Sequence, residues 1–151
     1  MKTLIKALAS GFGLGFIPFA PGTFGTLLGI LLLLPFSLLT PLWYIIATII
    51  LIIISSLISE KAEKIFKKKD ASMIVIDEVA GFIVTMALIK PSLYSVLIGF
   101  VYFRFFDIVK VWPARAFDKM QGGFAVVMDD VVAGIFANIL LRLTLKYFSI
   151  G

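Results

Sequence analysis

Residues 42–58 read LWYIIATIILIIISSLI, a run of 17 residues that contains no charged side chain. A helix of this length and character is long enough to cross the hydrocarbon core of a bilayer. Trp43 and Tyr44 stand at the start of the run, and such amphipathic aromatic rings are enriched at the membrane–water interface. This stretch therefore predicts a membrane-spanning helix, and it is the most secure element in the sequence.

The composition of the whole chain agrees with a membrane location. Of the 151 residues 61% are hydrophobic and only 15% are charged, which is far from the composition of soluble domains. No charged residue lies between Lys6 and Glu60, and that stretch has room for two membrane crossings. In such a chain the net charge of +5 indicates membrane orientation and contact with anionic lipid. We therefore expect a bilayer partner and no nucleic-acid partner.

The apolar segments predict an all-α fold, an integral membrane bundle of about five hydrophobic helices in one domain over residues 1–151. The expected helices are 23–39, 42–58, 75–89, 92–106 and 124–145. Residues 10–26 are rich in Gly and Pro, and they predict a loop or a broken interfacial segment. Residues 60–70 predict a polar connector or a short surface helix, and residues 110–123 predict a polar loop.

The lysines at 61–69 set the expected orientation, because Lys-rich connectors stay on the cytoplasmic side. Counting crossings from there leaves Lys90, Arg142 and Lys146 for the outer side. It brings all the acidic residues to or near the cytoplasmic face: Glu60, Glu63, Asp70, Asp77, Glu78, Asp107, Asp118, Asp129 and Asp130. The sequence thus predicts a polar site at the cytoplasmic end of the bundle.

Two residue types are missing, and their absence narrows the chemistry. The chain has no Cys, which excludes disulfides, thiolate-bound metals and a cysteinyl-phosphate mechanism. It has no His, which excludes a histidine nucleophile and His-ligated zinc. Any metal site must use hard oxygen ligands, which suit Mg²⁺.

Four short motifs bring ionisable groups to the predicted cytoplasmic face. They are Asp77-Glu78, Arg104 with Asp107, Arg115 with Asp118 and Lys119, and Asp129-Asp130. Ionisable residues beside hydrocarbon are costly, so they are candidates for function. Each also has a structural alternative: an Asp at a helix start can be a cap, and Arg104 with Asp107 can be a simple ion pair.

The pattern Asp-x-Val-Ala-Gly occurs twice, at 77–81 and at 130–134. In each copy Ala and Gly follow the Asp by three and four residues, so all three share one side of a helix. Small residues mark close helix contacts in membranes. We therefore expect two packed, parallel helices that bring Asp77 and Asp130 together, with a proton or cation between the carboxylates.

The segment APGTFG at 20–25 is a possible phosphate cradle, because a Gly-rich helix start offers free backbone N–H groups. Together with three other motifs it resembles the phosphatidylglycerophosphatase A family. The motifs are PGTFG at 21–25, IVIDEVAG at 74–81, FRFFDIVKVWPARAFDK at 103–119 and GGFAVVMDDVVAG at 122–134. Val111 and Ala125 depart from the family pattern, where Pro and Gly are usual, and these changes affect loop shape rather than ionisable groups.

The resemblance implies a multi-pass enzyme of the bacterial inner membrane, with its site facing the cytoplasm. Such an enzyme hydrolyses the lipid phosphatidylglycerophosphate to phosphatidylglycerol and phosphate with Mg²⁺. The expected catalytic and metal-binding residues are Asp77, Glu78, Asp107, Asp129 and Asp130. The expected phosphate-binding residues are Thr23, Arg104, Lys110, Arg115 and Lys119.

Two mechanisms and two other functions stay open at this stage. Direct attack by water is favoured, and the alternative is an aspartyl-phosphate formed on Asp107 or Asp129. A CDP-alcohol phosphotransferase also uses membrane-surface Asp clusters, but it resembles a longer D-x-x-D-G-x-x-A-R pattern that this chain lacks. A small cation transporter would place its acids near the bilayer midplane, whereas here they fall at predicted helix ends. The sequence predicts no particular oligomeric state.

Overall fold

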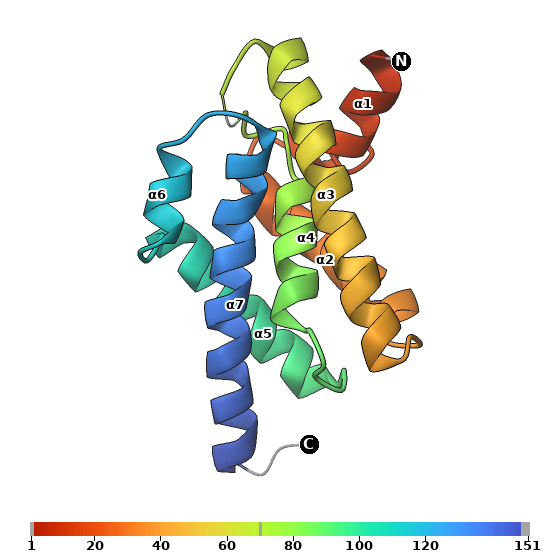
Figure 1. The fold of residues 1–151 in the computed structure, drawn as a ribbon, viewed down its shortest axis with the longest axis vertical. Helices are drawn as coiled ribbons and strands as arrows, with labels where there is room; N and C mark the ends of the chain where they lie inside the picture. Colours follow the sequence, from red (N-terminus) through yellow and green to blue (C-terminus); the bar gives the residue numbers. More distant parts are fainter. Residues whose placement is uncertain (1, 70, 149–151) are drawn as a thin grey trace.

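The computed structural model describes residues 2–69 and 71–148, except for the side chain of Asp118. Within these residues the chain forms seven α-helices, one short 3₁₀ turn and no strand, which confirms the all-α fold (Figure 1). The elements are α1 Lys2–Ala9, η1 Leu14–Phe16, α2 Pro21–Phe36, α3 Pro41–Phe66, α4 Ile76–Thr85, α5 Leu93–Val109, α6 Ala114–Asp118 and α7 Gly123–Phe148.

Only α3 and α7 are long and apolar enough to cross a membrane among the described helices, each with 26 residues. The expected five spanning helices are therefore not confirmed as such. α3 is longer than predicted because it continues to Phe66 through most of the expected polar connector. An ion pair between Glu60 and Lys64, 2.7 Å apart and one turn along the helix, stabilises this polar end.

Three further differences concern the shorter elements. The N-terminal residues form α1, which was not predicted, and the expected loop at 110–123 contains α6. α2 begins at Pro21 rather than near Thr23, in agreement with the preference of Pro for the first helical position. Pro35 lies within the last turn of α2, next to the final residue Phe36.

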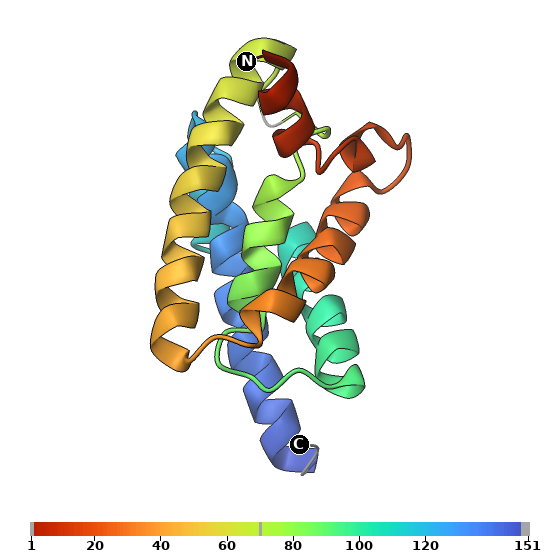
Figure 2. The same cartoon turned by 90° about the vertical axis from the view of Figure 1, so that its right-hand side faces the viewer.

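The short helix α4 lies at the centre of the bundle, where it packs against α2, α3 and α7 (Figures 1 and 2). The two glycines of the repeat bring α4 and α7 into close contact: a Cβ on Gly81 would lie 2.8 Å from the carbonyl oxygen of Asp130. A Cβ on Gly134 would collide with the carbonyl oxygen of Gly81. The expected packing of the two Asp-x-Val-Ala-Gly copies on parallel helices is therefore confirmed.

Side chains from α3 and α7 hold α4 near its C-terminal end. The Tyr44 hydroxyl donates to the carbonyl of Ile83 at 2.8 Å. The Asn138 amide donates to the carbonyls of Thr85 and Ala87 at 2.8 and 3.0 Å. Since helix C-termini leave carbonyls without intrahelical donors, these bonds complete the end of α4. They also fix the helix whose opposite end carries Asp77 and Glu78.

Candidate functional site

Three carboxylates from α4 and α7 meet at the N-terminal end of α4. Asp77 and Glu78 lie in the first turn of α4, and Asp130 comes from α7. One carboxylate oxygen from each of the three lies within 4.8 Å of the others. Asp77 and Asp130 are almost completely buried, at 6% and 4% exposure. The expected proximity of these two residues is confirmed, and we call Asp77, Glu78 and Asp130 the carboxylate triad.

The triad carries buried oxygen atoms that lack hydrogen-bond donors. Glu78 Oε2 and Asp130 Oδ2 are both buried without a hydrogen-bond partner among the described residues. Three carboxylates this close together repel one another, and burial makes the repulsion costly unless a proton or a cation compensates it. Three clustered carboxylates are also the ligand type that Mg²⁺ prefers. The triad therefore fits a divalent cation.

The other two acids of the predicted site are paired with basic residues instead. Arg104 Nη1 donates to Asp107 Oδ2 at 2.5 Å, one turn along α5. Lys110, just beyond the end of α5, donates to Asp129 Oδ2 of α7, also at 2.5 Å. These ion pairs are partly buried and hold a guanidinium and an ammonium group beside the triad.

The structural alternative of helix capping does not describe the acids. The N-cap of α4 is Val75, with no side-chain cap bond, and Asp77 lies inside the first turn. Asp129 and Asp130 lie well inside α7, which begins at Gly123, so they are not caps of that helix. The ion pair between Arg104 and Asp107 does form, as the second alternative expected.

The start of α2 closes the site through a glycine. A Cβ on Gly22 would collide with Glu78 Oε1 and would lie 2.9 Å from Nη1 of Arg104. A larger residue at this position would therefore displace the ends of the Glu78 and Arg104 side chains. Sequence reasoning assigned Thr23 in this segment, but Thr23 does not line the pocket, and its backbone N–H already donates to the carbonyl of Ala20 at 2.9 Å.

These groups surround one pocket of about 360 Å³. Four helices and the segment before α4 contribute to it. The described lining residues are Ala20, Pro21, Gly22, Ser72, Ile74, Asp77, Glu78, Arg104, Asp107, Ile108, Lys110, Val126, Asp129 and Asp130. The pocket thus combines acidic groups that suit a cation with basic groups that suit an anion, as a phosphate site requires.

Residues 7–145 match the sequence model of the family described as Phosphatidylglycerophosphatase A. The chain belongs to this family. It is 41% identical over 143 residues to Phosphatidylglycerophosphatase A of Haemophilus influenzae, covering 91% of this chain and 86% of the relative. The protein of the same name from Escherichia coli K12 is 36% identical over 150 residues, covering 95% and 85%. The phosphatidylglycerophosphatase A resemblance is therefore confirmed, and with it the class of phosphoric monoester hydrolases.

A third relative of this phosphatidylglycerophosphatase A chain carries a different name. The Putative phosphatidylinositol-3-phosphatase of Bacteroides thetaiotaomicron is 35% identical over 143 residues, covering 89% of each chain. No solved structure matches the chain. Relatives with two different names are therefore similar in sequence to most of this chain.

Two predicted site residues of this phosphatidylglycerophosphatase A family member lie outside the pocket, besides Thr23. Arg115 belongs to α6 and Lys119 follows it, and both side chains are exposed and do not line the pocket. α6 packs against α7 and turns these groups to solvent. Sequence reasoning also missed Gly22, Ser72 and Val126, of which only Gly22 had a signal, as part of the Gly-rich segment. Asp70 and the side chain of Asp118 lie outside the described residues.

Proposed function

We propose that this chain removes the phosphate of phosphatidylglycerophosphate, giving phosphatidylglycerol and inorganic phosphate, in a reaction that requires Mg²⁺. The observation that carries the proposal is the single pocket in which the carboxylate triad faces Arg104 and Lys110. The names of the relatives from Haemophilus influenzae and Escherichia coli support the lipid substrate. The missing Cys and His support hydrolysis without a thiol or imidazole nucleophile.

The triad is the proposed Mg²⁺ site, because Asp77, Glu78 and Asp130 fit a hard cation by type, spacing and burial. Bound there, a divalent cation supplies positive charge that compensates the phosphate oxygens as the phosphorus is attacked. The proposed metal site therefore has three of the five carboxylates that the sequence predicted as ligands. Asp107 and Asp129 are engaged with Arg104 and Lys110, so we propose that they position these two groups in addition to the role of one of them in the chemical step.

Arg104 and Lys110 bind the phosphomonoester and hold its negative charge during the displacement. Water attacks the phosphorus, the bond from phosphorus to the glycerol oxygen breaks, and the lipid alcohol leaves with a proton. A lining carboxylate, Asp107 or Asp129, accepts the proton of the attacking water and passes it to the leaving glycerol oxygen. The alternative is attack by one of these same carboxylates, followed by hydrolysis of the aspartyl-phosphate.

The proposed setting is the bacterial inner membrane, with α3 and α7 crossing the bilayer and the pocket facing the cytoplasm. Ile49 and Ile53 on α3 are about half exposed, at 52% and 54%, as expected for side chains that contact lipid. The lysines at the end of α3 support a cytoplasmic location for that end. The family assignment favours hydrolysis over the phosphotransferase and transporter alternatives.

A second candidate substrate is phosphatidylinositol 3-phosphate, which the name of the Bacteroides thetaiotaomicron relative favours. It carries the same phosphomonoester on a larger, cyclic alcohol. The test is phosphate release by the purified protein in detergent, with each lipid supplied at equal concentration and with Mg²⁺ present. We expect phosphatidylglycerophosphate to be hydrolysed faster. Faster hydrolysis of the inositol lipid would identify it as the preferred substrate instead. If the protein hydrolyses neither lipid, the proposed function is wrong.

A further inference from the structure

A hollow of about 450 Å³ lies between α1 and the end of α3, apart from the pocket that holds the triad. Its described lining residues are Lys2, Thr3, Lys6, Lys64, Ile65 and Lys67. Four of these six are lysines, and none is acidic. We call this feature the lysine hollow, and the proposed phosphatase chemistry makes no use of it.

The charge of the lysine hollow is largely uncompensated. Lys64 pairs with Glu60 at 2.7 Å, but Lys2, Lys6 and Lys67 form no ion pair with a described residue. Like charges gathered around a concave surface raise the local potential and favour an anion there. The hollow therefore suits a negatively charged ligand.

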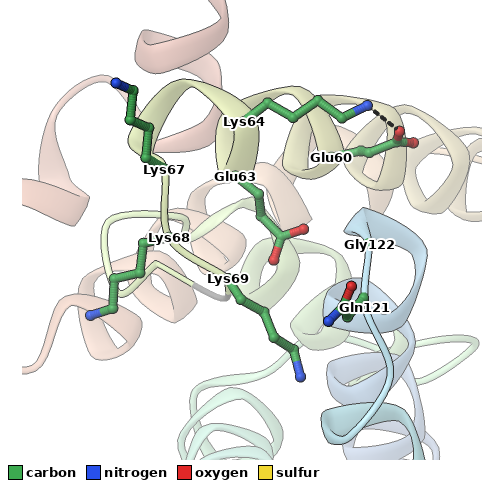
Figure 3. A pocket seen from close by; sticks show the side chains of 8 residues that line it. All are labelled: Glu60, Glu63, Lys64, Lys67, Lys68, Lys69, Gln121 and Gly122. Carbon is green, nitrogen blue, oxygen red and sulfur yellow. Dashed lines mark hydrogen bonds and ion pairs between the residues drawn. The ribbon is translucent and has the colours of Figure 1, made fainter.

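The adjoining hollow has a mixed lining of four lysines and two glutamates (Figure 3). It shares Lys64 and Lys67 with the lysine hollow, but Glu60 and Glu63 also line it. Figure 3 shows Lys64 turned toward Glu60, and Lys67 extending away from Glu63. The hollow on the α1 side thus differs from its neighbour in having lysines and no acidic residue in its lining.

The lysine hollow has a defined shape because α1 is fixed against α3. Ala9 and Ala62 are completely buried in one apolar cluster with Ile5 and Phe66 packed around it. The Lys6 ammonium lies 5.9 Å from the ring centroid of Phe66. These contacts hold the lysines of α1 beside those of α3.

Apolar side chains on the same N-terminal segment point to a lipid surface as the source of the anion. Leu4, Phe12, Phe16 and Phe19 are exposed at 62%, 77%, 52% and 68%. A short helix with lysines on one side and exposed apolar side chains nearby is typical of segments that lie in the membrane interface. A soluble anion or a nucleic acid would gain nothing from these apolar groups.

We infer that the lysine hollow binds the phosphodiester headgroup of an anionic phospholipid, with Leu4 and the exposed phenylalanines in the adjacent interface. The inference rests on the membrane placement proposed above but not on the phosphatase chemistry. It assigns to α1 the role of a docking element for anionic lipid on the face that carries the triad pocket.

The test compares variants that each change two lysines. Lys2→Gln with Lys6→Gln removes charge from the hollow, while Lys61→Gln with Lys90→Gln removes the same charge from positions that do not line it. Lys2→Arg with Lys6→Arg keeps the charge and controls for packing on Phe66. Binding of dihexanoyl phosphatidylserine and of dihexanoyl phosphatidylcholine is measured in neutral detergent by native mass spectrometry. Phosphatidylserine carries no phosphomonoester, so the readout does not depend on turnover.

We expect wild type, the Arg variant and the Lys61/Lys90 variant to prefer phosphatidylserine. The Lys2/Lys6 Gln variant should bind it roughly tenfold more weakly or worse, since each lysine near an anionic surface contributes on the order of 1 kcal/mol. Unchanged binding in that variant would overturn the inference. An equal loss of phosphatidylserine binding in the Lys61/Lys90 variant would show that binding depends on net charge and not on the lysine hollow. Glycerophosphoserine, the same headgroup without acyl chains, is measured in parallel. If it binds as tightly as the lipid, the ligand of the hollow is a soluble phosphodiester and the inference is wrong.

Discussion

Replacing Asp130 by Asn separates a metal-binding role from a structural one, because the two roles predict opposite changes in stability. Asp130 is 4% exposed, and one of its oxygens lies within 4.8 Å of oxygens from Asp77 and Glu78. Asn keeps the size and removes one negative charge from this cluster. Without Mg²⁺ the variant should therefore unfold at the same temperature as wild type or at a higher one.

With Mg²⁺ the order should reverse. A ligand at about 100 times its dissociation constant stabilises the folded state by about 2.7 kcal/mol, and Asp130→Asn should lose most of that gain. Phosphate release should fall at least about a hundredfold, on the order of 3 kcal/mol of transition-state stabilisation. The measurement is thermal unfolding in EDTA and in Mg²⁺, beside phosphate release at matched expression.

Two controls make the result specific. Glu60→Gln alters an exposed acid outside the pocket and should keep the Mg²⁺-dependent rise in unfolding temperature. Asp129→Asn breaks the ion pair with Lys110 and should lower stability in both conditions, since it leaves a partly buried ammonium group without this acid. A normal Mg²⁺ effect and near-normal turnover in Asp130→Asn would refute the reasoning and leave the carboxylate as a structural group.

Three other predictions follow from the fold. Gly22→Ala should reduce phosphate release strongly while the protein still folds, because the added methyl group collides with Glu78 beside Arg104; full activity would show that α2 can move aside. Asn138→Ala should lower the free energy of unfolding by about 1–3 kcal/mol, because the end of α4 loses two hydrogen bonds; a change below about 0.5 kcal/mol would contradict this. Single cysteines at Ile65 and Met120 should be labelled only from the cytoplasmic side, and one at Ser92 only from outside; labelling of Met120 from outside would break the proposed topology.

The central part of the site could be predicted from local patterns. The repeated Asp-x-Val-Ala-Gly places an acid one turn before a small residue, and close helix contact needs the small residue. This was enough to bring Asp77 and Asp130 together, as the contact of Gly81 with Gly134 confirms. The fold class followed from the apolar runs, because uncharged apolar runs of this length are typical of membrane helices.

Features that depend on the relative placement of helices could not be predicted. The pairing of Lys110 with Asp129 joins residues 19 positions apart, and it depends on how α5 ends beside α7. The exposure of Arg115 depends on the orientation of α6, which has five residues and no apolar periodicity to reveal it. The segment at 20–25 was expected to bind phosphate through backbone N–H groups, whereas the closeness of Gly22 to Glu78 appears only in three dimensions.

The central claim is that the carboxylate triad holds a Mg²⁺ ion required to release phosphate from phosphatidylglycerophosphate. Its most direct test is the initial rate of phosphate release by the wild-type protein as the free Mg²⁺ concentration is raised from zero. The account predicts no release in EDTA and a saturable rise with Mg²⁺. Undiminished release in EDTA, or none at any Mg²⁺ concentration, would contradict it.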